Sequence, residues 1–147
     1  MPFNSLQGIY FPGFCNLFSR ILEMDPLSHS CLPVHVACLY ELNETNKIFI
    51  LGHQLVDKLP QSAIAWYTVG AFYLSTGKHH EARRFFSKAS TLDPQMIPAW
   101  IGFAHSFAFE SEHDQAISAY SAAARIAKGY HIFPFLNFLE VINRTCL

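Results

Sequence analysis

The sequence predicts an all-α fold in which antiparallel helix pairs stack into a right-handed superhelix. Three observations lead to this prediction. Pro26, Pro60 and Pro94 recur at intervals of 34 residues, and Trp66 and Trp100 share that interval. Apolar residues within each interval follow helical spacing. Hydrophobic residues make up 51% of the 147 residues and charged residues only 14%, so the chain has ample apolar surface to order a fold.

The N-terminal part divides into three predicted segments. Residues 1–13 are a non-repeat segment, and residues 14–28 are the second helix of a partial repeat that ends near Pro26. Residues 29–62 form a degenerate repeat, which keeps helical spacing but lacks the aromatic and small residues of the later units. The apolar positions that carry this spacing are Leu32, Val36, Leu39, Ile48 and Leu55.

The best-formed unit spans residues 63–96. Its two apolar faces follow helical spacing, and Gly77 lies between them, where a left-handed turn residue can end the first helix. The residue before Pro94 is disfavoured in a helix, which ends the second one. A 34-residue period with this pattern is the signature of the tetratricopeptide repeat, here with valine at 69. Its structural residues are Trp66, Gly70, Tyr73, Ala82, Phe86, Ala89 and Pro94.

The next unit, residues 97–130, keeps the signature residues Trp100, Ala116, Tyr120 and Ala123. Ser111 is predicted to cap its second helix. Residues 131–147 are a poor or truncated helix of a further repeat. Because terminal repeats normally carry polar caps and both ends of this chain are apolar, we expect an internal segment of a longer repeat protein, which self-associates in isolation.

Composition and charge exclude several classes of protein. Ten Lys and Arg against 11 Asp and Glu give a net charge of −1, which argues against nucleic-acid binding. The four cysteines are too scattered for a disulfide scaffold, so a reducing, intracellular compartment is expected. The first charged residue is Arg20, so a basic signal-peptide start is lacking. The apolar stretch around residues 63–74 is shorter than the roughly 20 residues of a membrane span.

One cluster raises the alternative of a metal- or thiol-dependent enzyme. His29, Cys31, His35 and Cys38 lie close together, and the last three could share a helix face. Their spacing matches no structural zinc pattern, so packing is the favoured interpretation. We therefore predict no catalytic residue, no metal and no cofactor.

The surface expected to carry function is the concave groove formed by the first helix of each repeat. An apolar and aromatic lining there favours an extended or helical peptide held by apolar anchors. A generic adaptor that binds such a peptide stays open as an alternative. The residues predicted to line the groove are Ile64, Tyr67, Ala71, Leu74, Ile101, His105, Ala108 and Phe109.

A basic helix face lies in the second half of the best-formed unit. It is interpreted as a solvated face, with a rim contact for an acidic partner as the alternative. Its residues are Lys78, His79, His80, Arg83, Arg84 and Lys88.

Three strings go beyond the generic repeat. Residues 30–35, 81–89 and 105–116 resemble the family of the sixth subunit of the anaphase-promoting complex, the cell-division-cycle-sixteen proteins. The resemblance runs from about Phe14 to Gly129, and the third string is the most specific because it includes turn residues that the repeat does not dictate.

The resemblance implies a non-catalytic scaffold in a ubiquitin ligase of the cell cycle. It implies partners among the other tetratricopeptide subunits of that complex, and a small subunit whose N-terminal segment lies in the groove. It further implies a location in the nucleus and cytoplasm and at the spindle. The expectation of no membrane partner and no nucleic-acid partner comes from the composition and charge given above.

Overall fold

The computed structural model describes residues 5–28 and 30–128, and the described part consists of α-helices joined by turns. The all-α prediction is confirmed for these residues. The helices are α1 (Ser5–Met24), α2 (Leu32–Glu41), α3 (Thr45–Lys58), α4 (Ala63–Ser75), α5 (His79–Leu92), α6 (Ile97–Phe109) and α7 (His113–Ala127).

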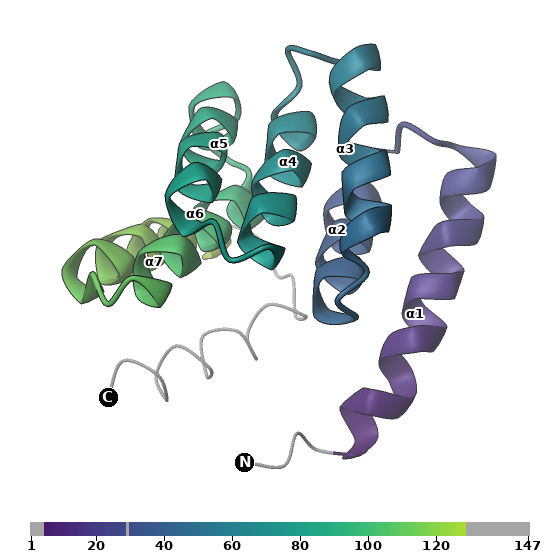
Figure 1. Cartoon of the computed structure of the whole chain (residues 1–147), viewed down its shortest axis with the longest axis horizontal. Coiled ribbons are helices and arrows are strands. Elements are labelled where there is room, and N and C mark those ends of the chain that lie inside the picture. The colour runs from purple at the N-terminus through teal and green to yellow at the C-terminus, as the bar shows by residue number, and fades with distance from the viewer. Residues whose placement is uncertain (1–4, 29, 129–147) are drawn as a thin grey trace.

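Helices α2 to α7 form three hairpin-like pairs, α2 with α3, α4 with α5 and α6 with α7, and the pairs stand side by side (Figure 1). Helix α1 packs against α2 at one end of the row. Contacts between α2 and α4 and between α4 and α6 connect the first helices of successive pairs. Each pair buries an apolar face against its neighbour, which is how a repeat solenoid is stabilised.

The helix pairs lie within the predicted repeats 29–62, 63–96 and 97–130. At the N-terminus the structure differs from the prediction, because α1 begins at Ser5 and crosses the expected boundary at residue 14. The helix continues through Pro12, although an interior proline removes one backbone hydrogen bond and crowds the carbonyl four residues earlier. The segment predicted for residues 131–147 lies outside the described residues.

The turn inside each pair uses one residue with a left-handed backbone. These residues are Asn43, Gly77 and Ser111, with φ values of 56°, 77° and 60°, and they follow the 34-residue period. The Gly77 N–H donates to the Leu74 carbonyl at 3.2 Å, and the next N–H donates to the Tyr73 carbonyl at 3.0 Å. The same two bonds occur at the other two turns, so all three are Schellman motifs.

Ser111 therefore ends the first helix of its pair. The prediction that Ser111 caps the second helix is wrong. The N-cap residue of α7 is Glu112, which makes no side-chain capping bond.

The repeated Trp and Pro residues are linked by a hydrogen bond. The Trp66 indole Nε1 donates to the Pro60 carbonyl at 2.8 Å, and Trp100 Nε1 donates to the Pro94 carbonyl at 3.0 Å. A half-buried indole N–H needs such a partner. The bond ties the first helix of a repeat to the loop before it, which gives the recurring tryptophan a structural role.

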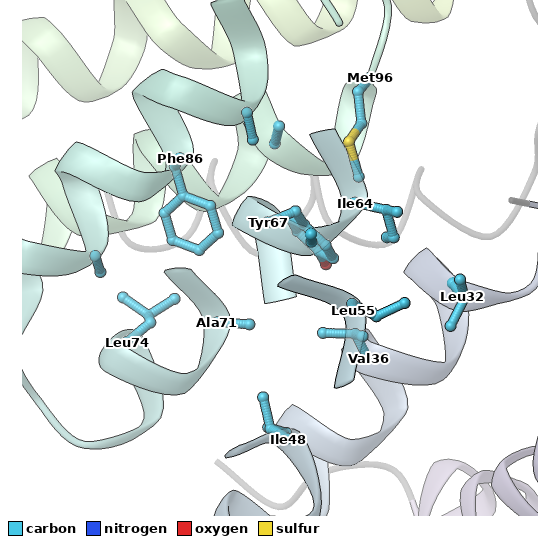
Figure 2. Packing of buried hydrophobic residues seen from close by; sticks show 14 of the residues in the cluster. Leu32, Val36, Ile48, Leu55, Ile64, Tyr67, Ala71, Leu74, Phe86 and Met96 are labelled. Carbon is cyan, nitrogen blue, oxygen red and sulfur yellow. The ribbon is translucent and has the colours of Figure 1, made fainter. Parts of the chain in front are cut away.

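Phe86 is the largest fully buried side chain of the core shown in Figure 2. A Cβ atom would lie 2.9 Å from its ring at Gly70 and 2.5 Å from it at Gly102, so only glycine fits either position without movement. In the degenerate repeat the sizes are exchanged: Val36 replaces Gly70 and Gly52 replaces Phe86, 34 residues earlier in each case. A Cβ atom at Gly52 would meet Thr68 of the next repeat at 3.6 Å, so a larger residue lies opposite this glycine on the neighbouring first helix.

Candidate protein-interaction site

The residues predicted to line the groove on α4 lie in the core instead. Ile64, Tyr67, Ala71 and Leu74 are all buried, with Ile64 only 3% exposed. Figure 2 shows them among side chains of α2, α3 and α5, and the Tyr67 ring contacts the Phe86 ring at 5.9 Å. The prediction of an open lining is corrected for these four residues. The cause is the preceding helix pair, which covers this face of α4 when the repeats stack.

The corresponding residues on α6 become more exposed along the helix. Ile101 is buried, His105 and Ala108 are half-buried, and Phe109 is 56% exposed. The Phe109 ring stacks on His79 of α5 at 4.8 Å with an interplanar angle of 12°. Of the eight predicted groove residues, His105, Ala108 and Phe109 are thus the ones with accessible surface.

A pocket with a volume of about 260 Å³ lies beside the start of α4. It is large enough for one or two apolar side chains of a peptide. Ile64 is the predicted groove residue that borders it. The full lining is Pro33, Ser62, Ala63, Ile64, Leu92, Asp93 and Met96. The other lining residues were missed because they come from loops and helix ends that helical periodicity does not place.

His105 and Tyr120 connect the two helices of the last pair. The Tyr120 hydroxyl lies 2.8 Å from His105 Nδ1, and the two rings meet edge to face at 5.7 Å. Burial lowers the pKa of His105 to about 4, so the ring is neutral at physiological pH. This pair joins α6 to α7.

The cluster that suggested a metal site is only partly within the described residues, because His29 lies outside them. Among the described residues, no group of three or more His, Cys, Asp and Glu is placed to hold a metal ion. Cys38 is buried close to Tyr67, and burial together with Cys38 raises the pKa of the Tyr67 hydroxyl. Burial, followed by the charge of Lys47, lowers the pKa of His35. Within α2, Cys38 is therefore a core residue and His35 is half-buried, while Cys31 directly precedes the helix.

No helix in residues 5–28 or 30–128 combines the length and the apolar character needed to cross a membrane.

The residues of the predicted basic face of α5 fall into two groups, one engaged in contacts and the other exposed. Arg83 forms ion pairs with Glu110 and Glu112, and its guanidinium lies 4.0 Å from the Phe107 ring centroid. It therefore connects α5 to the turn between α6 and α7. Sequence spacing gave no signal for this bridge, because its members are 27 and 29 residues apart. Lys78, His80, Arg84 and Lys88 stay exposed on the surface, whereas His79 is engaged by Phe109.

The helices form pairs that turn at a left-handed residue, and glycines lie where the helices approach each other closely. In two of the pairs a tryptophan indole donates a hydrogen bond to a proline carbonyl in the preceding loop. These features define a tetratricopeptide-repeat solenoid. A family model of the tetratricopeptide repeat matches residues 63–96. The chain is homologous to a segment of the Cut9 and CDC16 subunits of the anaphase-promoting complex. It is 54% identical over 118 residues to the anaphase-promoting complex subunit cut9 of Schizosaccharomyces pombe. It is 51% identical over 117 residues to the human cell division cycle protein 16 homolog.

These alignments cover 80% and 79% of this chain but only 17% and 19% of the two relatives. The chain therefore spans less than a fifth of their length. A solved structure of the Cut9–Hcn1 hetero-tetramer of the anaphase-promoting complex matches with a TM-score of 0.77 and 53% identity. That match covers 78% of this chain and 22% of the other. A Thermus thermophilus tetratricopeptide protein matches at a TM-score of 0.62 with 18% identity over 84% of this chain and 71% of its own, which shows the fold alone.

Proposed function

We propose that this chain is a non-catalytic scaffold segment that joins subunits of the anaphase-promoting complex, a cell-cycle ubiquitin ligase, in the nucleus and cytoplasm. The observation that carries the proposal is the match to Cut9 at 53% identity and a TM-score of 0.77. That identity is far above the 18% of a tetratricopeptide protein that shares the fold alone, so the likeness goes beyond the repeat signature.

The distribution of residue types supports a role in binding rather than in chemistry. The buried polar side chains in the described part are Thr68, Ser90 and Ser106, and each hydroxyl donates to a carbonyl of its own helix. These hydroxyls are committed to the backbone and not poised as nucleophiles. A repeat scaffold acts through the extended surface that its stacked helices present to partners, and it needs no buried reactive group.

We further propose that the groove side of this segment contacts a peptide-like subunit. The pocket bordered by Ile64 and Met96 would accept an apolar side chain of that peptide, and Phe109 would supply an exposed aromatic contact. The burial of the four α4 residues confines this contact to the pocket and to the end of α6.

The test is affinity purification of the tagged chain from dividing cells, with identification of the proteins that accompany it by mass spectrometry. We expect other anaphase-promoting complex subunits to be recovered. Phe109→Ala should lower the recovery of a peptide-like subunit, whereas Ile117→Ala, at a similarly exposed apolar residue on α7, should not. Recovery of chaperones alone would overturn the scaffold proposal. Recovery of one unrelated partner would instead favour the generic adaptor.

A further inference from the structure

The repeat at 63–96 carries a stack of aromatic rings between α4 and α5 that the fold does not require. The Phe85 ring lies parallel to Trp66 at 5.9 Å and parallel to Tyr73 at 5.2 Å, with interplanar angles of 1° and 9°. Trp66 and Tyr73 are two helical turns apart on α4, and Phe85 fills the space between them.

The stack continues across α4 toward α3. Tyr73 meets Phe72 edge to face at 5.3 Å, and Phe72 meets Phe49 of α3 at 5.2 Å. Phe49 is 45% exposed, and its neighbour Ile50 is 56% exposed. The rings thus form a continuous strip over three helices, called here the aromatic strip (Phe49, Trp66, Phe72, Tyr73 and Phe85).

Cations lie at both ends of the stacked rings. The Lys88 Nζ lies 3.3 Å from the Trp66 ring centroid, and the Lys78 Nζ lies 5.9 Å from that of Tyr73. Arg84 is exposed one turn before Lys88 on α5. Among the described residues, no ion pair engages these three cations, and Glu81 is the acidic residue of α5. The outer face of α5 is therefore positive in a chain of net charge −1.

The equivalent positions in the next repeat show that this arrangement is not part of the repeat signature. The residues 34 positions after Phe85, Lys88 and Lys78 are Ala119, Ala122 and Glu112. That repeat keeps its Trp and its fold without the stack or the cations. The repeat signature thus does not explain why the aromatic strip and its lysines occur together.

We propose that the outer face of α3 to α5 is a docking surface for an acidic peptide segment of a protein partner, one that alternates carboxylates with apolar side chains. Its carboxylates pair with Lys78, Arg84 and Lys88, and its apolar side chains cover Phe49 and the edges of the aromatic strip. Ring edges carry partial positive charge, so they add to the attraction for carboxylates. This surface is formed by residues of α3, α4 and α5 and of the turn before α5, and it shares no residue with the pocket or with the end of α6 discussed above.

The geometry favours a peptide over a nucleic acid. Bases bind such surfaces by stacking on open ring faces. Both faces of Phe85 are occupied by Trp66 and Tyr73, and Lys88 covers part of Trp66. Three cations beside a net negative chain are also few for a phosphate backbone.

The test measures fluorescence polarisation of a labelled synthetic peptide of alternating glutamate and phenylalanine on the full chain. We expect saturable binding that weakens with salt, and no binding of the matching lysine–phenylalanine peptide. The double variant Arg84→Glu/Lys88→Glu should weaken binding by about tenfold or more, because two attractive contacts become repulsive. The matched control Arg125→Glu/Lys128→Glu makes the same change of net charge at exposed positions on and after α7 and should alter binding by less than about twofold.

Circular dichroism of each variant checks that the helices are retained. Phe49→Ala, which removes an exposed ring without changing charge, should also weaken binding. Absence of binding by the glutamate–phenylalanine peptide would overturn the proposal. Equal weakening in both double variants would also overturn it, because net charge alone would then account for the binding. If an oligothymidine binds in an Arg84- and Lys88-dependent manner while the peptide does not, the surface is a nucleic-acid site and the proposal is wrong.

Discussion

Asn43, Gly77 and Ser111 occupy one structural position in three successive repeats, and each has a left-handed backbone. A side chain at such a position clashes with its own backbone at a cost of roughly 1 kcal/mol, which glycine avoids. The two non-glycine turns are therefore strained relative to the turn at Gly77. The Schellman bonds that all three share compensate for this strain.

Ser111→Gly is expected to raise the free energy of unfolding by about 0.5–1 kcal/mol, because it relieves strain that outweighs the added flexibility of the unfolded chain. Gly77→Ala should lower it by about 1 kcal/mol. Chemical denaturation monitored by circular dichroism measures both changes. The control is Ser118→Gly, the same substitution at an exposed position inside α7, which should be destabilising because glycine disfavours a helix. If both serine variants destabilise the chain, left-handed strain at Ser111 is not the dominant effect.

The half-buried imidazole of His105 predicts a loss of stability in mild acid. Its pKa is about 4 in the folded chain and 6.5 in the unfolded one, so between these values the unfolded chain binds a proton that the folded chain does not. The free energy of unfolding should therefore be highest above pH 6.5 and fall as the pH drops toward 4, by at most roughly 3 kcal/mol from this residue.

Denaturation curves between pH 7 and pH 5 check this expectation. His105→Gln should flatten the pH dependence, whereas His113→Gln, at an exposed site on α7, should leave it unchanged. His35, whose pKa is also lowered, should preserve part of the slope in the His105 variant. A slope that is identical in wild type and His105→Gln would assign the acid sensitivity to other groups.

At the level of helices, close packing depends on where a large side chain faces a glycine. Phe86 lies against Gly70 and Gly102, so α5 approaches both α4 and α6 closely. Gly102→Ala places a methyl group 2.5 Å from the Phe86 ring and should destabilise the chain by about 1–2 kcal/mol. Gly52→Ala meets its nearest side chain at an ordinary 3.6 Å, and should stabilise α3 by about 0.5–1 kcal/mol through helix propensity.

Thermal denaturation of the Gly102→Ala and Gly52→Ala variants tests this packing directly, because the two substitutions are expected to change the stability in opposite directions. Phe86→Leu shortens the side chain that faces Gly102, so it should reduce the cost of Gly102→Ala in the double variant. Additive effects of the two substitutions would show that Phe86 is not the group that excludes a side chain at 102.

The helix pairs were predictable from sequence because the 34-residue period and the Pro, Trp and small residues recur locally. The position of α1 was not, because an uncharged stretch with Gly and Pro gives conflicting local signals and the helix continues through Pro12. The groove lining on α4 was predicted incorrectly, because Ile64 and Tyr67 are covered by a different helix pair, and periodicity within one repeat does not reveal which of its faces a neighbour buries. The bridge from Arg83 to Glu110 and Glu112 also depends on stacking between repeats.

Over the whole molecule, the contacts of the described helices connect each pair mainly to the next one along the row. In such an array the stability of one repeat depends on its own helices and on the interfaces with its neighbours. The repeat at 63–96 has a neighbour on each side, and Arg83 and Phe86 both fasten it to α6 and the turn that follows. Within residues 30–128, damage to this repeat should therefore reach described helices on both of its sides, whereas damage at 97–128 should reach the described helices that precede it.

Hydrogen exchange measured by mass spectrometry tests this asymmetry with two equivalent substitutions. Trp66→Ala and Trp100→Ala each remove a half-buried indole and its bond to a proline carbonyl, at a cost of about 3 kcal/mol. Trp100→Ala should accelerate exchange most in α6 and α7, less in α4 and α5, and least in α2 and α3. Trp66→Ala should accelerate exchange in all six helices, because α4 packs against α2, α3, α5 and α6. If both variants accelerate exchange uniformly from α2 to α7, the chain unfolds as a single cooperative unit and the nearest-neighbour description fails.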